Sequence, residues 1–244
     1  MKLYQDYIFD LYGTLVDIRT DEEQQGLWDK MSQLYGGYGA VYTPEELHAL
    51  YKKTVAEKEE RAEEKSVSYP EISIEDVFRE LYEAEGIVPS EELVTHTGQF
   101  FRVLSTRHIR LYAGAGELLR RLRERGRGVY LLSNAQRVFT ERELRLLQIK
   151  DCFDGILISS DCGVKKPDEK FFHILLEKYR IAPEHALMIG NDPDCDVKGA
   201  RRAGMDTFYI HSGISPKTDG KVDADYSMMK MNLKVLQKRL LSEQ

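Results

Sequence analysis

One stretch of sequence, Ile8-Phe9-Asp10-Leu11-Tyr12-Gly13-Thr14-Leu15, indicates both the fold and the chemistry of this chain. A short apolar run leads here directly into a carboxylate, Asp10, at the turn that follows. Open α/β sheets bind their ligands at the carboxyl ends of the strands. We therefore expect Asp10 to lie at such a strand end and to be a functional residue.

Five short apolar runs, including the one before Asp10, have the character of buried strands. Each lacks polar alternation and is flanked by turn or polar residues, which is typical of a parallel strand covered on both faces. The runs are residues 7–9, 129–132, 155–158, 186–189 and 207–210. Stretches with helical spacing of apolar residues lie between them. This alternation predicts an α/β fold with a doubly wound parallel sheet.

Residues 17–106 interrupt the alternation, because they show helical patterns and many charges but no convincing buried strand. We interpret them as a smaller helical domain, with residues 1–16 and 107–244 forming the α/β core domain. Thr43-Pro44-Glu45-Glu46 is a capping box, and Ser73 can cap a second helix of the insert. In the tail, Asn232 can cap a closing amphipathic helix.

The composition argues against several classes of function. The 244 residues include 35 Lys and Arg and 41 Asp and Glu, and the net charge of -6 offers no excess of positive charge for nucleic acid. Neither a signal peptide nor an apolar run of about 18 residues is visible, so we expect a cytoplasmic protein without nucleic-acid or membrane partners. The three cysteines form no Cys-x-x-Cys pair, which gives a disulfide framework or a zinc site little support.

Polar residues follow two more of the predicted strands. Ser133 and Asn134 end the run 129–132, although either residue would also make an ordinary helix cap. Lys166 stands directly before a proline, which disfavours helix at the lysine. Its ammonium could offset the negative charge of Asp10. The alternative is a solvated surface lysine.

The turn after the run 186–189 gathers three carboxylates, Asp192, Asp194 and Asp196. Like charges that close raise one another's pKa unless a cation lies among them. Ligation by oxygen alone suits magnesium. The turn therefore predicts a magnesium site. An acidic helix N-terminus favoured by the helix dipole is the alternative, and it explains Asp194 better than the whole cluster.

Taken in order, these features resemble the four motifs of the haloacid dehalogenase (HAD) superfamily of hydrolases, with the helical insert where many members carry a cap. The resemblance implies that Asp10 attacks phosphorus or carbon and becomes transiently esterified. It adds Thr14, in the same motif, to the catalytic residues. Ser133, with Asn134 beside it, would bind a phosphoryl oxygen, and Lys166 would offset the charge of the nucleophile and the bound group.

The resemblance also implies a magnesium site on Asp10, on the backbone carbonyl of Tyr12 and on two residues of the acidic turn. Asp192 and Asp196 fit the shorter of the two spacings found in the family, and we favour this pair. With the longer spacing, Asn191 would replace the first ligand and weaken metal binding.

Tyr12 departs from the typical phosphatases of the family, which carry a second Asp at this position. That Asp protonates the leaving alcohol and then activates water, and such help is worth about 10²- to 10⁴-fold in rate. A phenol with an ordinary pKa of about 10 is a poor base at neutral pH. We therefore expect phosphatase activity, if present, to be slow or to borrow another group.

Three functions stay open on this basis. One is a magnesium-dependent hydrolase of a small phosphorylated metabolite, and another is a phospholigand-binding or regulatory protein. The remaining one is a metal-free 2-haloacid dehalogenase, because the family's dehalogenases carry Tyr at this position and halide leaves without a proton. Such enzymes receive the halide with an arginine near the cap, for which Arg61, Arg79 and Arg102 are candidates.

Four aromatic residues of the insert, Trp28, Tyr35, Tyr38 and Tyr42, surround a glycine-rich stretch. One hypothesis is that they face the site and select the substrate, with the glycines permitting closure. The other is that the rings form a small core of the insert itself, since aromatic residues supply much buried area.

Overall fold

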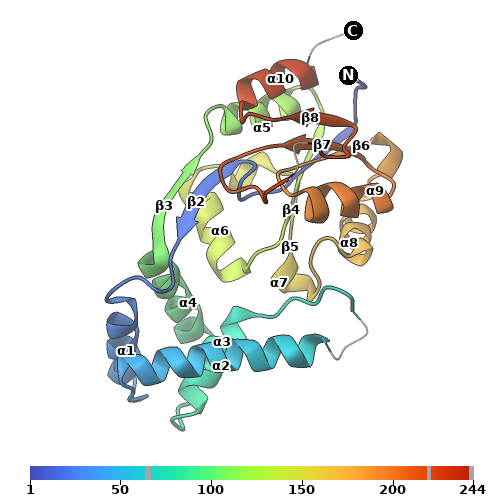
Figure 1. Cartoon of the computed structure of the whole chain (residues 1–244). Coiled ribbons are helices and arrows are strands. Elements are labelled where there is room, and N and C mark those ends of the chain that lie inside the picture. The colour runs from blue at the N-terminus through green and yellow to red at the C-terminus, as the bar shows by residue number, and fades with distance from the viewer. Residues whose placement is uncertain (64–66, 219–220, 242–244) are drawn as a thin grey trace.

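The computed structural model describes residues 1–63, 67–218 and 221–241. A six-stranded parallel sheet in the order β5-β4-β1-β6-β7-β8 lies at its centre, so the predicted α/β fold with a doubly wound sheet is confirmed (Figure 1). The elements in chain order are β1 (Asp6–Phe9), β2 (Val16–Thr20), α1 (Leu27–Gly37), α2 (Pro44–Glu63), α3 (Ile74–Glu83), α4 (Glu91–Ser105), β3 (Thr106–Leu111), α5 (Ala115–Glu124), β4 (Gly128–Ser133), α6 (Arg137–Leu146), η1 (Lys150–Cys152), β5 (Gly155–Ile158), α7 (Ser159–Cys162), α8 (Glu169–Tyr179), η2 (Pro183–His185), β6 (Ala186–Gly190), η3 (Pro193–Lys198), α9 (Gly199–Arg202), β7 (Asp206–Ile210), β8 (Tyr226–Met228) and α10 (Leu233–Leu241).

Helices cover both faces of the sheet, which explains why its strands lack polar alternation. In β1, Tyr7 and Phe9 belong to the apolar cluster that includes residues of α5, α6 and α10. Ile8, between them, belongs to a second cluster with residues of α8 and α9. All five predicted strands are present. β8, a strand of three residues at the edge of the sheet, was not predicted.

β1 lies between β4 and β6 in the sheet, so the polar residues that follow these three strands can meet. In the register of the sheet, Phe9 is level with Leu131 of β4 and with Ile189 of β6. Because the three strands are parallel, the residues that follow them emerge at one edge of the sheet. Asp10 and Asn191 are the residues directly after β1 and β6, so they are neighbours at that edge.

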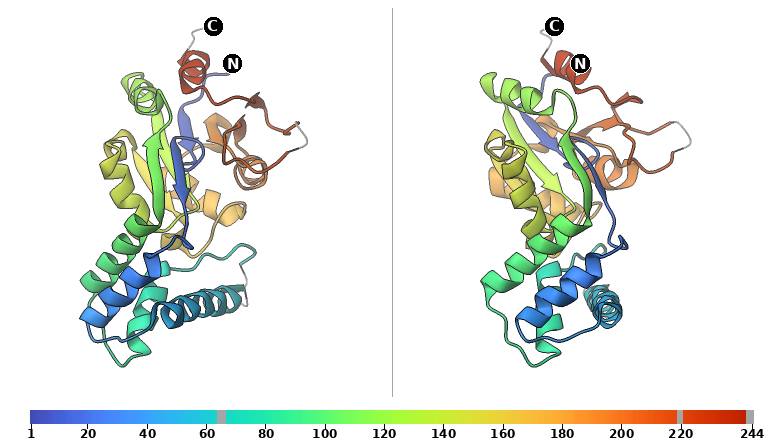
Figure 2. Two further views of the ribbon diagram at one scale, coloured as in Figure 1. Left: turned by 60° about the vertical axis from the view of Figure 1, so that its left-hand side comes forward. Right: turned by 90° about the vertical axis from the view of Figure 1, so that its left-hand side faces the viewer.

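A two-stranded antiparallel ribbon, β2 paired with β3, connects the sheet to helices α1–α4 (Figure 2). No buried strand was predicted in residues 17–106, where most of β2 lies, and β3 was not predicted either. Val16 and Ile18 pack on the core of the sheet, whereas Arg19 and Thr20 are exposed. Two buried positions in five residues are too short a pattern to separate a strand from a loop.

Helices α1–α4 form a layer beyond the carboxyl edge of the sheet, and their apolar cluster also includes Val138 and Phe139 of α6 (Figures 1 and 2). Trp28 and Tyr35 are buried in this cluster, Tyr42 packs against it, and Tyr38 is 52% exposed. The structure therefore supports the interpretation in which three of these rings form a small core of the insert, to which α6 also contributes.

The predicted helix starts are confirmed by their hydrogen bonds. In the capping box, the Glu46 N–H donates to Thr43 Oγ1 at 3.2 Å, and the Thr43 N–H donates to Glu46 Oε2 at 2.9 Å. Ser73 and Asn232 each accept a hydrogen bond from the backbone N–H three residues further on, at 3.4 and 3.1 Å. The three cysteines are free thiols. Within the described parts of the chain, no helix has both the length and the apolar character needed to cross a bilayer.

Candidate active site

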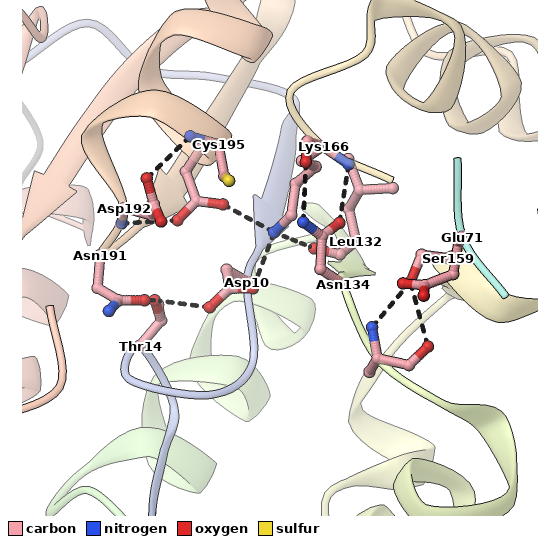
Figure 3. A network of polar contacts seen from close by, with 12 residues as sticks. Asp10, Thr14, Glu71, Leu132, Asn134, Ser159, Lys166, Asn191, Asp192 and Cys195 are labelled. Atoms are coloured by element: carbon pink, nitrogen blue, oxygen red, sulfur yellow. Dashed lines mark hydrogen bonds and ion pairs between the residues drawn. The ribbon is translucent and has the colours of Figure 1, made fainter. Parts of the chain in front are cut away.

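The carboxylate of Asp10 lies at the turn after β1 and is only 8% exposed (Figure 3). Its Oδ1 accepts a hydrogen bond from Lys166 Nζ at 2.8 Å, and its Oδ2 accepts one from Thr14 Oγ1 at 3.2 Å. A cation and a hydroxyl therefore hold the two oxygens in a fixed orientation. The residue borders a pocket, so a substrate could reach the carboxylate.

Lys166 is buried, and its ammonium has three acceptors. Besides Asp10, it donates to Asp196 Oδ1 at 2.7 Å and to the carbonyl of Leu132 at 2.8 Å. Burial lowers the pKa of Lys166, but the two carboxylates outweigh burial and raise the pKa above its ordinary value. The side chain is therefore a permanent cation, and the predicted proximity of Lys166 to Asp10 is observed.

Asp196 is also fully enclosed, and its second oxygen accepts a hydrogen bond from the Asp192 N–H at 2.9 Å. Burial raises the pKa of Asp196 to about 7, although the Lys166 ammonium opposes this rise. Gly190, at the end of β6, makes room for the carboxylate. A Cβ at Gly190 would lie 2.2 Å from an oxygen of Asp196, so any other residue would displace that side chain.

The two predicted residues after β4 have different surroundings. Asn134 accepts a hydrogen bond from the Lys166 N–H at 2.8 Å and donates to the Lys166 carbonyl at 2.9 Å. Its amide therefore holds the lysine backbone in place. Ser133 is fully buried, and its hydroxyl has no hydrogen-bond partner within the described part of the chain. A buried hydroxyl without a partner is costly unless a ligand or water satisfies it.

In the acidic turn, Asp192 and Asn191 have different surroundings. Asp192 Oδ1 accepts hydrogen bonds from the N–H groups of Asp194 and Cys195, at 2.8 and 2.9 Å, so this carboxylate caps the first turn of η3. The side chain that faces Asp10 is Asn191, which corresponds to the longer spacing to Asp196. Asp194 is exposed and pairs with Lys198, away from the site.

The Asn191 amide lies against three oxygen atoms of the first motif. With its nitrogen turned toward them, it donates to Tyr12 O at 3.1 Å and to Asp10 Oδ2 and Thr14 Oγ1 at 3.3 Å. Gly13 permits this approach, because a Cβ there would lie 2.4 Å from the amide. Among the described residues, no group of three or more Asp, Glu, His or Cys side chains is arranged to hold a metal ion.

The phenol of Tyr12 is bound to α6. Its hydroxyl donates to Glu143 Oε2 and lies 3.1 Å from Thr140 Oγ1. Arg102 of α4 donates to Glu143 Oε1 at 2.6 Å, and its guanidinium lies 5.7 Å from the centre of the Tyr12 ring. Burial and the Glu143 carboxylate raise the pKa of Tyr12 above its ordinary value, so this phenol cannot act as a base. Glu143 was not predicted, because a glutamate inside a helix carries no local signal.

Two of the three arginines considered for a halide site are paired elsewhere. Arg102 pairs with Glu143, and Arg79 donates to Glu91 at 2.7 Å. Arg61 borders a different pocket, between α2 and the segment before α3. Within the described ranges, none of the three lines the pocket beside Asp10.

The pocket beside Asp10 has a volume of about 210 Å³, and its apolar wall comes from the loop after β7. Ile214 and Pro216 form this wall, and Ser215 Oγ lies 3.3 Å from the Asn191 amide. This loop was not predicted to be part of the site. The signal was available, since the loop follows a predicted parallel strand and so emerges at the same edge as Asp10.

The chain resembles known hydrolases in sequence and in structure. A family model described as haloacid dehalogenase-like hydrolase matches residues 7–204. Phosphoserine phosphatase of Thermus thermophilus is 35% identical over 143 residues, which cover 59% of this chain and 56% of that protein. Glyceraldehyde 3-phosphate phosphatase of Pyrococcus furiosus is 31% identical over 121 residues, which cover 49% of this chain and 50% of that protein. The chain thus spans about half the length of these curated relatives. The crystal structure of 2-haloacid dehalogenase from Pseudomonas syringae superposes with a TM-score of 0.63 at 19% identity, covering 98% of this chain and 100% of that one, which shows a shared fold.

Lys166→Met is expected to lower the free energy of unfolding by about 3–5 kcal/mol, because it leaves two enclosed carboxylates without their cation. In an Asp196→Asn background the same substitution should cost less, since only Asp10 then loses its partner. Urea denaturation of the single and double variants measures both values. The neighbouring Lys165→Ala is the control and should change stability by no more than about 0.5 kcal/mol. Additive effects of Lys166→Met and Asp196→Asn would contradict the expectation.

Proposed function

The chain belongs to the haloacid dehalogenase-like hydrolase family, and we propose that it hydrolyses a small phosphomonoester through an ester formed on Asp10. The observation that carries this proposal is the pairing of the Asp10 carboxylate with the buried ammonium of Lys166, beside a pocket of small-molecule size. Two relatives named as phosphatases support the choice of phosphomonoesters over other esters.

The proposed reaction has two steps. In the first, an oxygen of Asp10 attacks the substrate phosphorus, the bond from phosphorus to the alcohol oxygen breaks, and the alcohol leaves. In the second, water attacks the same phosphorus and releases the carboxylate together with inorganic phosphate. Lys166 offsets the charges of the carboxylate and the phosphoryl group, and the hydroxyl of Ser133 can donate to a phosphoryl oxygen.

We also propose that magnesium binds beside Asp10. Magnesium prefers oxygen ligands and takes few protein carboxylates. Asp10 Oδ2, the Tyr12 carbonyl and the Asn191 amide oxygen are a donor set of this kind, once the amide turns its oxygen toward the other two. A bound ion would neutralise charge on the phosphoryl group. Asp192 is not part of this set, because it caps the turn, and Asp196 acts through Lys166.

The proposed phosphatase is slow, because position 12 supplies no acid or base. The phenol of Tyr12 is bound to Glu143, and its raised pKa prevents it from activating water. The leaving alcohol therefore takes its proton from solvent, without the help of about 10²- to 10⁴-fold that a placed carboxylic acid provides.

Two residues favour a second candidate function, the hydrolytic dehalogenation of a 2-haloacid. The Asn191 amide nitrogen and the Lys166 ammonium can together satisfy Asp10 without a metal ion. Halide departs without a proton, so the lack of an acid at position 12 would not matter. Against this function, none of the three candidate arginines lines the pocket among the described residues.

We infer that residues 17–106 act as a cap over the core formed by residues 1–16 and 107–244. Helices α1–α4 lie beyond the sheet edge that carries Asp10, where a cap could control access (Figure 1). The loop of Ile214 and Pro216 supplies the apolar wall of the pocket itself. We propose that this loop selects the organic part of a small phosphorylated metabolite.

The proposed function is tested by a substrate screen with and without magnesium. Phosphoserine, glyceraldehyde 3-phosphate and p-nitrophenyl phosphate should be hydrolysed slowly with magnesium and not in chelator. Turnover of 2-chloropropionate in chelator would support dehalogenation instead. Asp10→Asn should reduce either activity at least about 10³-fold. Binding of inorganic phosphate without any turnover would support a phospholigand-binding or regulatory role.

Asn191→Asp is expected to bind magnesium at least about 10-fold more tightly than the wild type, because a second carboxylate then faces Asp10 and requires a cation. Calorimetric titration with magnesium measures the affinity. The melting temperature of the variant should also rise with magnesium and fall in chelator. Asp192→Asn is the matched control and should leave magnesium affinity unchanged, since Asp192 caps the turn. The reverse pattern would place the metal on Asp192.

Tyr12→Asp is expected to raise phosphomonoester turnover at least about 10-fold, because the new carboxyl is small enough to leave Glu143 and act as acid and base. Tyr12→Asn removes the same ring without adding an acid, so it should give no gain. Steady-state kinetics on p-nitrophenyl phosphate measure the turnover of both variants and of the wild type. Equal rates for the two variants would show that the missing acid is not what limits turnover.

A further inference from the structure

The segment Tyr69–Ile74, which we call the strap, leaves the helical layer before α3 and pairs with a loop of the core. The Lys165 N–H donates to the Tyr69 carbonyl at 2.9 Å, and the Glu71 N–H donates to the Gly163 carbonyl at 3.2 Å. Between these bonds, residues 70 and 164 form an antiparallel bridge. The strap therefore pairs by its backbone with the loop that leads into Lys166.

The strap also binds the loop after β4 through the side chain of Gln136. The Gln136 amide donates to the Ile72 carbonyl at 2.9 Å and accepts from the Ile74 N–H at 2.9 Å. One side-chain amide therefore satisfies two backbone groups of the strap, the Ile72 carbonyl and the Ile74 N–H. Gln136 directly precedes α6, two residues after Asn134.

A third contact runs through Glu71 and the fully buried Ser159 (Figure 3). Ser159 Oγ donates to Glu71 Oε2 at 2.7 Å and accepts from the Ala135 N–H at 2.8 Å. The Ala135 carbonyl lies 3.1 Å from the same hydroxyl, so two acceptors compete for its one proton, and the Glu71 carboxylate is the nearer and the charged one. Hydrogen bonds to a charged acceptor are stronger than those between neutral groups.

The strap therefore contacts both loops that carry the proposed anion site. One contains Lys166, and the other begins at Asn134, directly after Ser133 at the end of β4. Asn134 accepts a hydrogen bond from the Lys166 N–H and donates one to the Lys166 carbonyl. We propose that Glu71 and Gln136 are positioning residues: they dock the strap, and the docked strap holds Lys166 and Ser133 in the arrangement that receives the substrate anion. A helical layer that moved away from the core would release both loops together.

This proposal rests on the proposed function for its kinetic test. Glu71→Ala should lower kcat for p-nitrophenyl phosphate about 10-fold and change KM by less than about 2-fold, because the pocket remains but its charged groups are displaced. Gln136→Ala should act in the same direction. Glu71→Gln keeps an acceptor for Ser159 and should recover most of the activity. A purely structural role for Glu71 would instead lower stability and leave the kcat of the folded protein unchanged.

Glu91→Ala is the matched control. Glu91 lies in the same helical layer, is highly exposed and pairs with Arg79 of that layer. The substitution removes a glutamate and an ion pair without touching the strap. It should leave kcat, KM and the amide hydrogen exchange rates of Lys165 and Ala135 at their wild-type values.

Amide hydrogen exchange tests the strap without any substrate. In Glu71→Ala, the amides of Lys165 and Ala135 should exchange about 10-fold faster than in the wild type and in Glu91→Ala. Unchanged exchange at both amides would overturn the proposal, and so would faster exchange with unchanged kcat. Wild-type protein that is inactive on every substrate would refute the proposed function alone, and the exchange rates in the same samples would then decide whether the strap holds the loops.

Discussion

The arrangement at the sheet edge depends on one enclosed cation, the ammonium of Lys166. It joins Asp10 after β1, the carbonyl of Leu132 in β4 and Asp196 after β6, so one side chain connects three neighbouring strand ends. Two buried carboxylates and one buried ammonium would each be unstable alone, and they persist because each satisfies the others. The same contacts that stabilise the edge also orient the Asp10 carboxylate, which is the proposed nucleophile.

Much of this edge could be predicted from the sequence, because strand ends are local features that topology then brings together. Five apolar runs located the strands, and the parallel sheet places Asp10, Lys166 and Asp196 side by side. The choice between Asn191 and Asp192 could not be predicted. Which of two adjacent residues points inward depends on the phase of the turn, and here capping of η3 turns Asp192 away. The partner of Tyr12 could not be predicted either, because Glu143 contacts it only through tertiary packing.

Tyr12 and Asn191 affect the same property of the site, namely how charge and protons are distributed around the Asp10 carboxylate. Tyr12 forms a cluster with Glu143 and Arg102, and its hydroxyl is already bound to Glu143. Asn191 puts a neutral amide where a carboxylate would demand a cation. Nucleophilic attack remains available to such a site, whereas any later step that needs a proton is left to solvent. The first step is common to phosphoryl transfer and to halide displacement, and the leaving group distinguishes the two.

The position of the tryptophan in the helical layer has a spectroscopic consequence. The sequence holds one tryptophan, Trp28, which stacks on His48 with ring centroids 4.4 Å apart and donates its indole N–H to the Glu22 carbonyl at 3.0 Å. Indole emission therefore originates entirely in this layer and carries no direct signal from the sheet. Far-UV circular dichroism reports on both layers together. A difference between the melting curves recorded by the two methods measures how far the helical layer and the sheet lose their order independently.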